Sequence, residues 1–314
     1  MTRKPPLPPP LAPFEGKPLP TPDWFSSLQA EPVETGVTDF DGGEISWKAW
    51  GKRGNPVLVL IHGGTAHKGW WDAIGPFLAR EDYFVVAPDL PGMGESSWWD
   101  HYAMDHHARA ILAGAKDAAG DALGRPIFVG HSFGGFVTLK AATTFGEDLR
   151  AAVVMDSPIR KPDAPRDGPP PKRGGKVYPE LAQALARFRL IPEQEVEDLW
   201  LVDHIARGSL KQVEGGHTWR FDPGIWSKLR TEPRNPEAAA AALKCPIAFV
   251  RGAQSVLMQS EVWTYMQSVF TDSPFVTVPD AKHHLVLDQP LATTAVVHAL
   301  AQGWARQVKD RPVL

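Results

Sequence analysis

The sequence GHSFGG at residues 130–135 lies between an apolar run, PIFVG at residues 126–130, and a helical pattern that begins FVTLKAA at residue 136. A buried strand followed at once by a helix leaves these six residues a tight turn. Such a turn needs small residues beside its apex, which Gly130 and Gly134 supply, and it forces Ser132 into strained backbone angles with its hydroxyl exposed. The G-x-S-x-G spacing in this setting is typical of a nucleophile elbow, so Ser132 is the candidate nucleophile.

Similar apolar runs lie on both sides of this turn, and helical patterns separate them. The runs are at residues 56–61, 83–87, 151–155, 246–251 and 274–278, and the helical patterns are at residues 70–80, 103–123, 134–145, from 260 and 290–308. This alternation predicts βαβ crossovers, hence an α/β fold with a mostly parallel, twisted sheet and helices on both faces. A β-hairpin over residues 33–50 is expected to precede it.

Prolines mark two interruptions of this rhythm. Nine of the 31 prolines lie in residues 1–22, which predicts an extended, polyproline-like arm that is solvated or loosely docked. A second proline-rich stretch, at residues 157–177, precedes helical patterns at 178–190 and 192–207. The predicted organisation is a proline-rich N-terminal arm (1–32), a first part of the core (33–156), a helical cap or lid inserted in it (157–244) and a second part of the core (245–314).

The composition excludes several classes of function. The 314 residues include 33 basic and 36 acidic ones in a mixed distribution, which argues against a nucleic-acid binder. One cysteine, Cys245, excludes an internal disulfide, and no apolar run is long enough to span a bilayer. The basic, proline-rich N-terminus has no apolar core of a secretory signal, so a cytoplasmic location and no membrane partner are expected. The oligomeric state stays open, with a homodimer among the options.

A second glycine motif, HGGT at residues 62–65, follows the apolar run PVLVLI. An oxyanion hole needs two backbone N–H groups aimed at one oxygen, each worth roughly 3 kcal/mol of transition-state stabilisation. Phe133, next to Ser132, is the candidate for one donor and Gly64 for the other. The alternative interpretation is that the glycines serve only close packing. His62 is expected to orient the loop rather than to act as a base.

Together with PDLPGMGES at residues 88–96 and DQP at residues 288–290, these motifs resemble the α/β-hydrolase fold superfamily in order and spacing. Within it, the chain looks most like the capped, haloperoxidase- or epoxide-hydrolase-like branch. The resemblance covers about residues 33–309, weakens through the cap, and implies a sheet of about eight strands. Epoxide hydrolases and haloalkane dehalogenases of this fold use a carboxylate where this chain has Ser132.

The resemblance also implies a late histidine and an acid. His283, in PDAKHHL at residues 279–285, matches the catalytic histidine, with His284 as the fallback. The usual position of the acid holds Ser255, which cannot stabilise an imidazolium. Some members use the end of the preceding core strand, where this chain has Asp156. The alternatives are Glu261, a carboxylate of the lid, or an incomplete triad.

Tryptophans gather after the strands that end near Ser132. Loops after strand ends converge over the site in this architecture, so we expect some of these rings to form a wide, apolar substrate pocket. An equal alternative is that they join the lid to the core. The candidates are Trp70, Trp71, Trp98, Trp99 and Trp219, with Trp200 and Trp226 in the lid.

These features favour a serine hydrolase that cleaves a carboxylic ester or lactone of an apolar substrate with water. The same triad serves carbon–carbon bond hydrolysis, perhydrolysis and acyl transfer, and a non-catalytic ligand-binding protein is the alternative from another class. No cofactor is expected. Nor is a metal site, because His101, Asp105, His106 and His107 lie at near-helical spacing without a third ligand motif.

Overall fold

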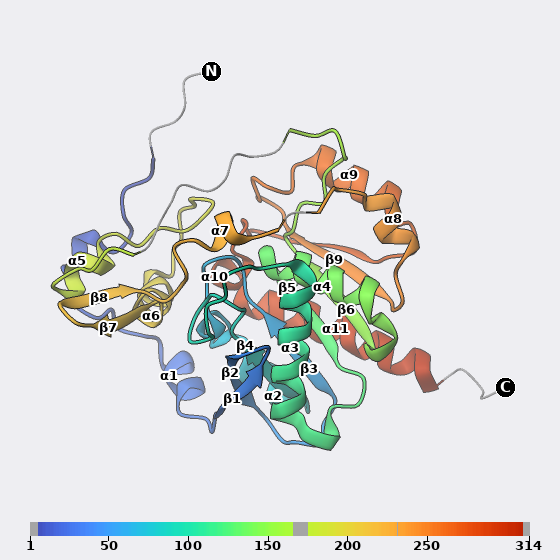
Figure 1. Cartoon of the computed structure of the whole chain (residues 1–314), viewed down its shortest axis with the longest axis horizontal. Helices are drawn as coiled ribbons and strands as arrows, with labels where there is room; N and C mark the ends of the chain where they lie inside the picture. The colour runs from blue at the N-terminus through green and yellow to red at the C-terminus, as the bar shows by residue number, and fades with distance from the viewer. Residues whose placement is uncertain (1–5, 166–174, 231, 310–314) are drawn as a thin grey trace.

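The computed structural model describes residues 6–165, 175–230 and 232–309 of the chain. Its main sheet has eight strands in the order β1-β2-β4-β3-β5-β6-β9-β10 (Figure 1). In this sheet β2 pairs antiparallel with β1 and with β4, and the other five strand pairs are parallel. The predicted mostly parallel sheet is confirmed. The strands are β1 (Glu34–Phe40), β2 (Gly43–Trp50), β3 (Val57–Ile61), β4 (Phe84–Pro88), β5 (Ile127–His131), β6 (Ala151–Met155), β9 (Ile247–Gly252) and β10 (Phe275–Val278).

Helices cover both faces of the sheet, which is why the central strands read as continuous apolar runs. Successive residues of a strand point to opposite faces. Leu58 and Val85 pack in the core beneath α2 (Gly75–Arg80) and α11 (Pro290–Lys309). Their neighbours Val59 and Phe84 pack beneath α3 (Met104–Ala119) and α4 (Phe133–Thr144). A third cluster lies under α9 (Ser260–Val269), and the short α10 (Leu285–Asp288) precedes α11.

The helix predicted over residues 70–80 is shorter in the structure. A 3-10 turn, Lys68–Trp71, comes first, and α2 begins only at Gly75. Pro76 explains the late start, because a proline fits the first turn of a helix but not its interior. None of the helices in the described ranges has the length and apolar character needed to cross a bilayer.

The chain between β6 and β9, predicted to be helical, holds a small sheet as well as helices. Its helices are α5 (Leu181–Leu185), α6 (Leu199–Gly208), α7 (Ile225–Lys228) and α8 (Pro236–Ala241), and its strands are β7 (Leu210–Val213) and β8 (Gly216–Trp219). Gly215 and Gly216 have positive φ angles of 81° and 138°, which favour glycine and close the hairpin. The proline-rich residues 166–174 lie outside the described part of this segment.

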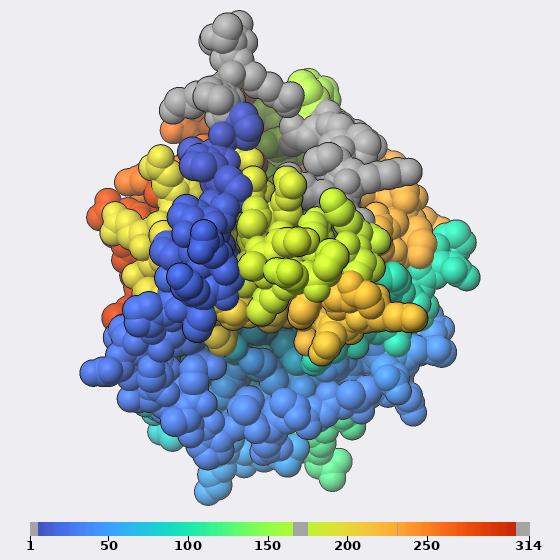
Figure 2. All heavy atoms as spheres, turned by 90° about the vertical axis from the view of Figure 1, so that its left-hand side faces the viewer, coloured from blue at the N-terminus to red at the C-terminus, as the bar shows by residue number. Residues whose placement is uncertain are grey.

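The N-terminal arm lies against the body of the protein. The described part of the stretch predicted to be extended, residues 6–22, contains one 3-10 turn, Ala12–Phe14, and the helix α1 (Asp23–Gln29) follows it. Figure 2 shows the arm, in blue, lying along the segment between β6 and β9, in yellow-green. Leu11, Phe25 and Leu28 of the arm are buried. Docking of the arm therefore removes apolar side chains from water, which favours it.

The arm joins the core to the segment between β6 and β9. The Trp24 ring stacks on Phe77 of α2 and meets Trp200 of α6 edge-on, at centroid distances of 5.8 and 5.5 Å. The Leu19 amide donates to Asp203 Oδ2 of α6 at 3.1 Å. Arg207, also of α6, donates to a carbonyl oxygen of the arm. Residues 6–32 of the arm therefore belong to the folded body.

Replacing Phe25 with alanine tests this docking. The ring is only 1% exposed and lies 4.8 Å from the Trp200 ring. We expect the free energy of unfolding to fall by about 3–5 kcal/mol, because the cavity left by a buried phenylalanine is not refilled. Urea unfolding at neutral pH measures the change, and Val37→Ala, at a 56% exposed position, is the control. A loss no larger than that of the control would mean that the arm is detached in solution.

Candidate active site

Ser132 occupies the sharp turn between β5 and α4, with φ 53° and ψ −117°. This positive φ strains any residue with a side chain. Both flanking glycines are required by space, because a Cβ on Gly130 would lie 2.2 Å from the carbonyl oxygen of Gly134, and one on Gly134 would lie 2.3 Å from that of Ile61. The Ser132 amide donates to the Met155 carbonyl oxygen at 2.8 Å, which ties the turn to β6. The turn thus has the geometry of a nucleophile elbow.

Ser132, His283 and Asp156 form one hydrogen-bonded chain. His283 Nε2 lies 3.1 Å from Ser132 Oγ, and His283 Nδ1 lies 2.7 Å from Asp156 Oδ1. A carboxylate only accepts, so Nδ1 carries the proton and Nε2 offers its lone pair to the serine hydroxyl. Of the two adjacent histidines, His283 is the one hydrogen-bonded to Ser132. This arrangement can take a proton from Ser132 Oγ and stabilise the resulting imidazolium.

The loop that carries His283 reaches the site from β10 by crossing the end of β9. Gly252 ends β9, and a Cβ there would lie 2.2 Å from the carbonyl oxygen of Lys282. Only a residue without a side chain lets the loop pass so close. Lys282, which stands where the resemblance implies a glycine, donates from Nζ to the Glu195 carbonyl oxygen at 2.8 Å.

Asp156 follows β6 and is fully buried, and three donors satisfy its carboxylate. Besides His283, Ser255 Oγ donates to Oδ1 at 2.6 Å and the Gly252 amide donates to Oδ2 at 2.9 Å. Ser255 occupies the position that the resemblance gives to the acid, and its hydroxyl instead donates to Asp156 at the end of the neighbouring strand β6. Sequence reasoning missed this role. Glu261, an alternative acid, is exposed on α9 and lines a separate cavity.

The HGG loop lies directly beside the elbow. A Cβ on Gly63 would lie 3.4 Å from Ser132 Cβ, and one on Gly64 would lie 3.5 Å from Phe133 Cβ. Phe133 is the first residue of α4, where a backbone N–H has no partner within the helix. His62 fixes the loop, since its Nε2 accepts from the Leu90 amide at 3.0 Å. Gly64 and Phe133 remain the predicted oxyanion donors.

A cavity of about 60 Å³ opens beside Ser132. Its walls come from the HGG loop, the elbow and the segment between β6 and β9. They are Gly63, Gly64, Thr65, Ala66, Trp70, His131, Ser132, Phe188, Arg189, Leu190, Ile191, Ser209 and His284. A second cavity of about 400 Å³ shares part of this wall and extends to Trp219, Lys176 and Arg187. No motif in the sequence singles out the wall residues of the segment.

Two of the five tryptophan candidates lie at these cavities and three do not. Trp70 lines the first and Trp219 the second. Trp71 follows Trp70 in the same 3-10 turn and is buried in the core. Trp98 is 46% exposed beneath Lys211, and Trp99 donates to the Asp41 carbonyl oxygen. The wide apolar pocket stays a prediction.

Several buried histidines near the site are held neutral. Burial lowers the pKa of His131 to about 3 and that of His67 to about 4, and it lowers the pKa of His284 well below its usual range. Burial also lowers the pKa of His107 to about 3. His107 stacks on Tyr102, meets the Phe133 ring edge-on, and has no hydrogen-bond partner for either ring nitrogen among the described residues.

His107 is expected to make the protein acid-sensitive. Its pKa is lower in the folded chain than the ordinary 6.5, so the unfolded chain binds more protons between about pH 6.5 and 3. The free energy of unfolding therefore falls on acidification through this window, by about 1.4 kcal/mol per pH unit for each such group. Urea unfolding of wild type and His107→Phe at pH 7.5, 6 and 5 should show a shallower fall in the variant. Equal slopes would contradict the neutral, buried state of His107.

A family model and several curated proteins match this chain. The model of a family described as the alpha/beta hydrolase family matches residues 58–296. A bifunctional esterase/perhydrolase of Acinetobacter calcoaceticus is 31% identical over 159 residues, 49% of this chain and 55% of the relative. A lipase of Mycobacterium tuberculosis is 34% identical over 116 residues, 37% of this chain and 42% of the relative. The matches thus span about half the length of these curated relatives.

Among solved structures, the thioesterase domain from the curacin biosynthetic pathway matches with a TM-score of 0.69. The match covers 86% of this chain and 99% of that domain at 22% identity. At this identity the likeness concerns the fold alone.

Proposed function

The chain belongs to the alpha/beta hydrolase family, and we propose that it cleaves a carboxylic ester or lactone through an acyl-enzyme on Ser132. The observation that carries the proposal is the continuous hydrogen-bonded chain from Ser132 Oγ through His283 to Asp156, with distances of 3.1 and 2.7 Å. Ester hydrolysis in general is also what the names of the esterase and lipase relatives suggest.

In the proposed reaction, Ser132 Oγ attacks the ester carbonyl carbon while His283 Nε2 takes the hydroxyl proton. The carbonyl oxygen becomes an oxyanion held by the amides of Phe133 and Gly64. His283 then returns the proton to the leaving alcohol, and the acyl group stays on Ser132. Water then attacks the acyl carbon while His283 Nε2 takes one of its protons. The bond from the acyl carbon to Ser132 Oγ breaks, His283 returns the proton to Oγ, and the carboxylic acid leaves. Asp156 stays ionised and stabilises the imidazolium in both halves.

The two cavities suggest how an ester would sit. A short acyl or alkyl group fits the cavity of about 60 Å³ beside Ser132, and the remainder extends into the larger one. Apolar side chains such as Phe188 and Ile191 line both cavities. Lys176 and Arg187 line the larger one, so an ester with a remote carboxylate belongs in any substrate panel.

A fluorophosphonate probe followed by an ester panel tests the proposal. We expect one probe adduct per chain, on Ser132, and turnover of p-nitrophenyl esters with an initial burst of p-nitrophenol. Acetyl, butyryl, octanoyl and succinyl esters then compare short, long and anionic acyl groups. An unlabelled wild-type protein with no burst would contradict the proposal.

Perhydrolysis is the second candidate, because the relative from Acinetobacter calcoaceticus is named an esterase/perhydrolase. Hydrogen peroxide would replace water in the second half of the reaction and release a peracid. Adding peroxide to an ester assay and measuring peracid separates the two outcomes. Carbon–carbon bond hydrolysis and acyl transfer to alcohols are followed in the same way, with a vinylogous diketone and with added alcohol. The argument for a ligand-binding protein without turnover is that the usual acid position holds Ser255. The hydrogen bond between Asp156 and His283 removes this argument.

A further inference from the structure

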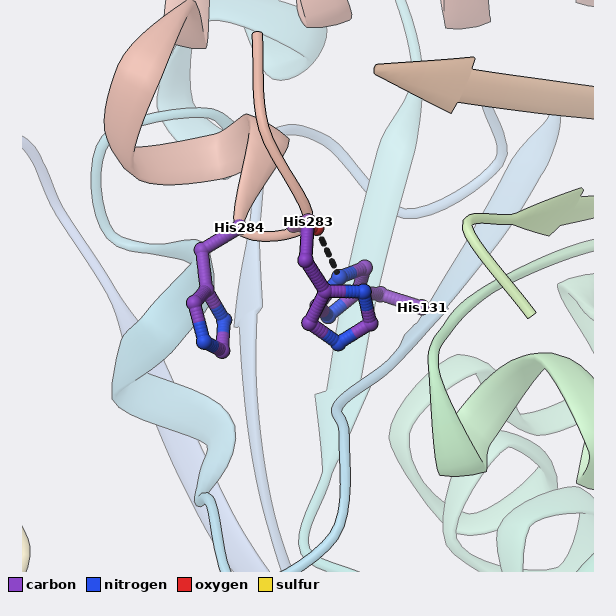
Figure 3. Close-up of side chains that lie close together, drawn as sticks. All are labelled: His131, His283 and His284. Atoms are coloured by element: carbon purple, nitrogen blue, oxygen red, sulfur yellow. Dashed lines mark hydrogen bonds between the residues drawn. The ribbon is translucent and has the colours of Figure 1, made fainter. Parts of the chain in front are cut away.

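Three histidine rings gather at the carboxyl end of the sheet, beside the proposed nucleophile. His131 ends β5, and His283 and His284 precede α10 (Figure 3). One ring nitrogen of each lies within 4.8 Å of those of the other two, and all three residues are buried. The proposed reaction uses His283 alone. The near-helical histidines at residues 101–107, considered in the sequence, do not form this cluster.

Hydrogen bonds fix which nitrogen of His131 and His284 carries the proton. His131 Nε2 lies 2.8 Å from the carbonyl oxygen of His283, and His284 Nε2 lies 3.3 Å from that of Pro192. A carbonyl oxygen can only accept, so both Nε2 atoms are protonated donors. In each neutral ring this leaves Nδ1 with a lone pair. His284 Nδ1 is buried without a hydrogen-bond partner among the described residues.

In His283 the two nitrogens have exchanged roles, with the proton on Nδ1 and the lone pair on Nε2. Its Nδ1–H donates to Asp156, and its Nε2 lone pair accepts from Ser132. Each of the three rings therefore donates its N–H to an oxygen, and the lone pair of its other nitrogen is available to a ligand. Metal-binding histidines in proteins are supported in this way, by a carboxylate or carbonyl behind the ring.

We propose that His131, His283 and His284 form a binding site for a divalent transition ion, Zn²⁺ or Cu²⁺, which inhibits the enzyme by drawing His283 Nε2 away from Ser132. Three neutral imidazoles suit ions of borderline softness, whereas Mg²⁺ and Ca²⁺ require oxygen ligands. Zinc accepts three protein ligands and leaves a fourth position for water. The ion is an inhibitor and not a cofactor, because His283 cannot hold it and take a proton at the same nitrogen.

The cluster needs only a small adjustment to hold the ion. Nitrogen ligands about 2.0–2.1 Å from zinc stand about 3.4 Å apart in a tetrahedron, so the rings must close from within 4.8 Å by side-chain rotation. The ion reaches them through the cavity beside Ser132, which His131 and His284 line.

Calorimetric titration of zinc into Ser132→Ala tests binding without any reaction. Loss of the hydroxyl removes the group that competes for His283 Nε2, so the variant should bind one ion per chain at least as tightly as wild type. In the same background, His284→Gln and His131→Gln should each weaken binding by about tenfold or more, and His101→Gln, an exposed control, should not. Cobalt absorption at visible wavelengths reports tetrahedral nitrogen ligation, and thermal melting checks that each variant folds.

Inhibition is tested on the wild-type protein with the fluorophosphonate probe. Zinc should slow labelling of Ser132 at the concentrations at which it binds, chelator should restore labelling, and Mg²⁺ should have no effect. Zinc binding that survives both histidine substitutions, absence of binding at millimolar zinc, or binding without slower labelling would each overturn the proposal. Inhibition rests on the proposed function, whereas binding to Ser132→Ala does not. A wild-type protein that the probe never labels therefore contradicts the function and leaves the titration to decide the site.

Discussion

Replacement of Ser132 by alanine is expected to lower kcat for ester hydrolysis by about 10⁴-fold or more. The variant keeps the oxyanion donors and the cavity but has no atom to form the acyl-enzyme, and loss of a serine nucleophile in such triads removes nearly all catalysis. Steady-state turnover of a p-nitrophenyl ester, with the pre-steady-state burst, measures the loss. Ser268→Ala, at an exposed position on α9, is the matched control and should retain wild-type turnover.

The same position offers a stability measurement. Ser132→Gly should abolish turnover as completely as Ser132→Ala, yet it should raise the free energy of unfolding by about 1–2 kcal/mol relative to that variant. Glycine adopts the φ of 53° without strain, whereas alanine does not. Urea unfolding of the two inactive variants gives the difference directly. Residual turnover within tenfold of wild type in either variant would show that another group is the nucleophile.

Replacement of Asp156 by asparagine is expected to lower kcat by about 10³–10⁴-fold. The amide cannot balance the charge of an imidazolium, and its NH₂ group facing His283 would favour the wrong tautomer. The loss should appear in kcat rather than in KM, since Asp156 lies behind the histidine and does not line the cavity beside Ser132. Ser255→Ala, which removes one donor to the carboxylate, should cost far less, about tenfold.

Two further variants decide where the acid resides. Glu261→Gln should retain wild-type turnover, because Glu261 is exposed on α9 and lines a separate cavity. Asp156→Asn combined with Ser255→Asp moves the carboxylate to the neighbouring strand end, since Ser255 Oγ lies 2.6 Å from Asp156 Oδ1. This double variant should recover at least tenfold of the turnover lost in Asp156→Asn. If Asp156→Asn alone stays within tenfold of wild type, Asp156 is not the acid.

The sheet was predictable because each central strand can be recognised from its own short stretch of sequence. Buried parallel strands need apolar side chains on both faces, so PVLVLI, PIFVG and AAVVM are readable without knowledge of the rest of the chain. The residues directly after strand ends were readable for the same reason. Ser132 and Asp156 each follow such a run, and parallel neighbours bring their carboxyl ends to one edge.

Features that depend on packing between distant segments were not predictable. Trp70 and Trp71 are adjacent in sequence, and only the 3-10 turn decides that one lines the cavity and the other is buried in the core. The prolines of the arm do not reveal its contacts, in which Trp24 packs on α2 and Phe25 on α6. The sequence shows only that no acid stands at position 255, because the contact between Ser255 and Asp156 joins residues that are 99 positions apart.

Ser132 and His283 lie outside the segment between β6 and β9, and Asp156 is its first residue, directly after β6. Phe188, Leu190 and Ile191, further along that segment, form part of the cavity wall. One part of the cavity wall therefore comes from a stretch of the chain that lies well after Asp156 and well before His283. Insertions, deletions or recombination between β6 and β9 can remodel the cavity while the elbow, the histidine loop and the buried carboxylate keep their distances. Proteins that descend from such a chain can change the shape of the cavity while Ser132, His283 and Asp156 keep their arrangement.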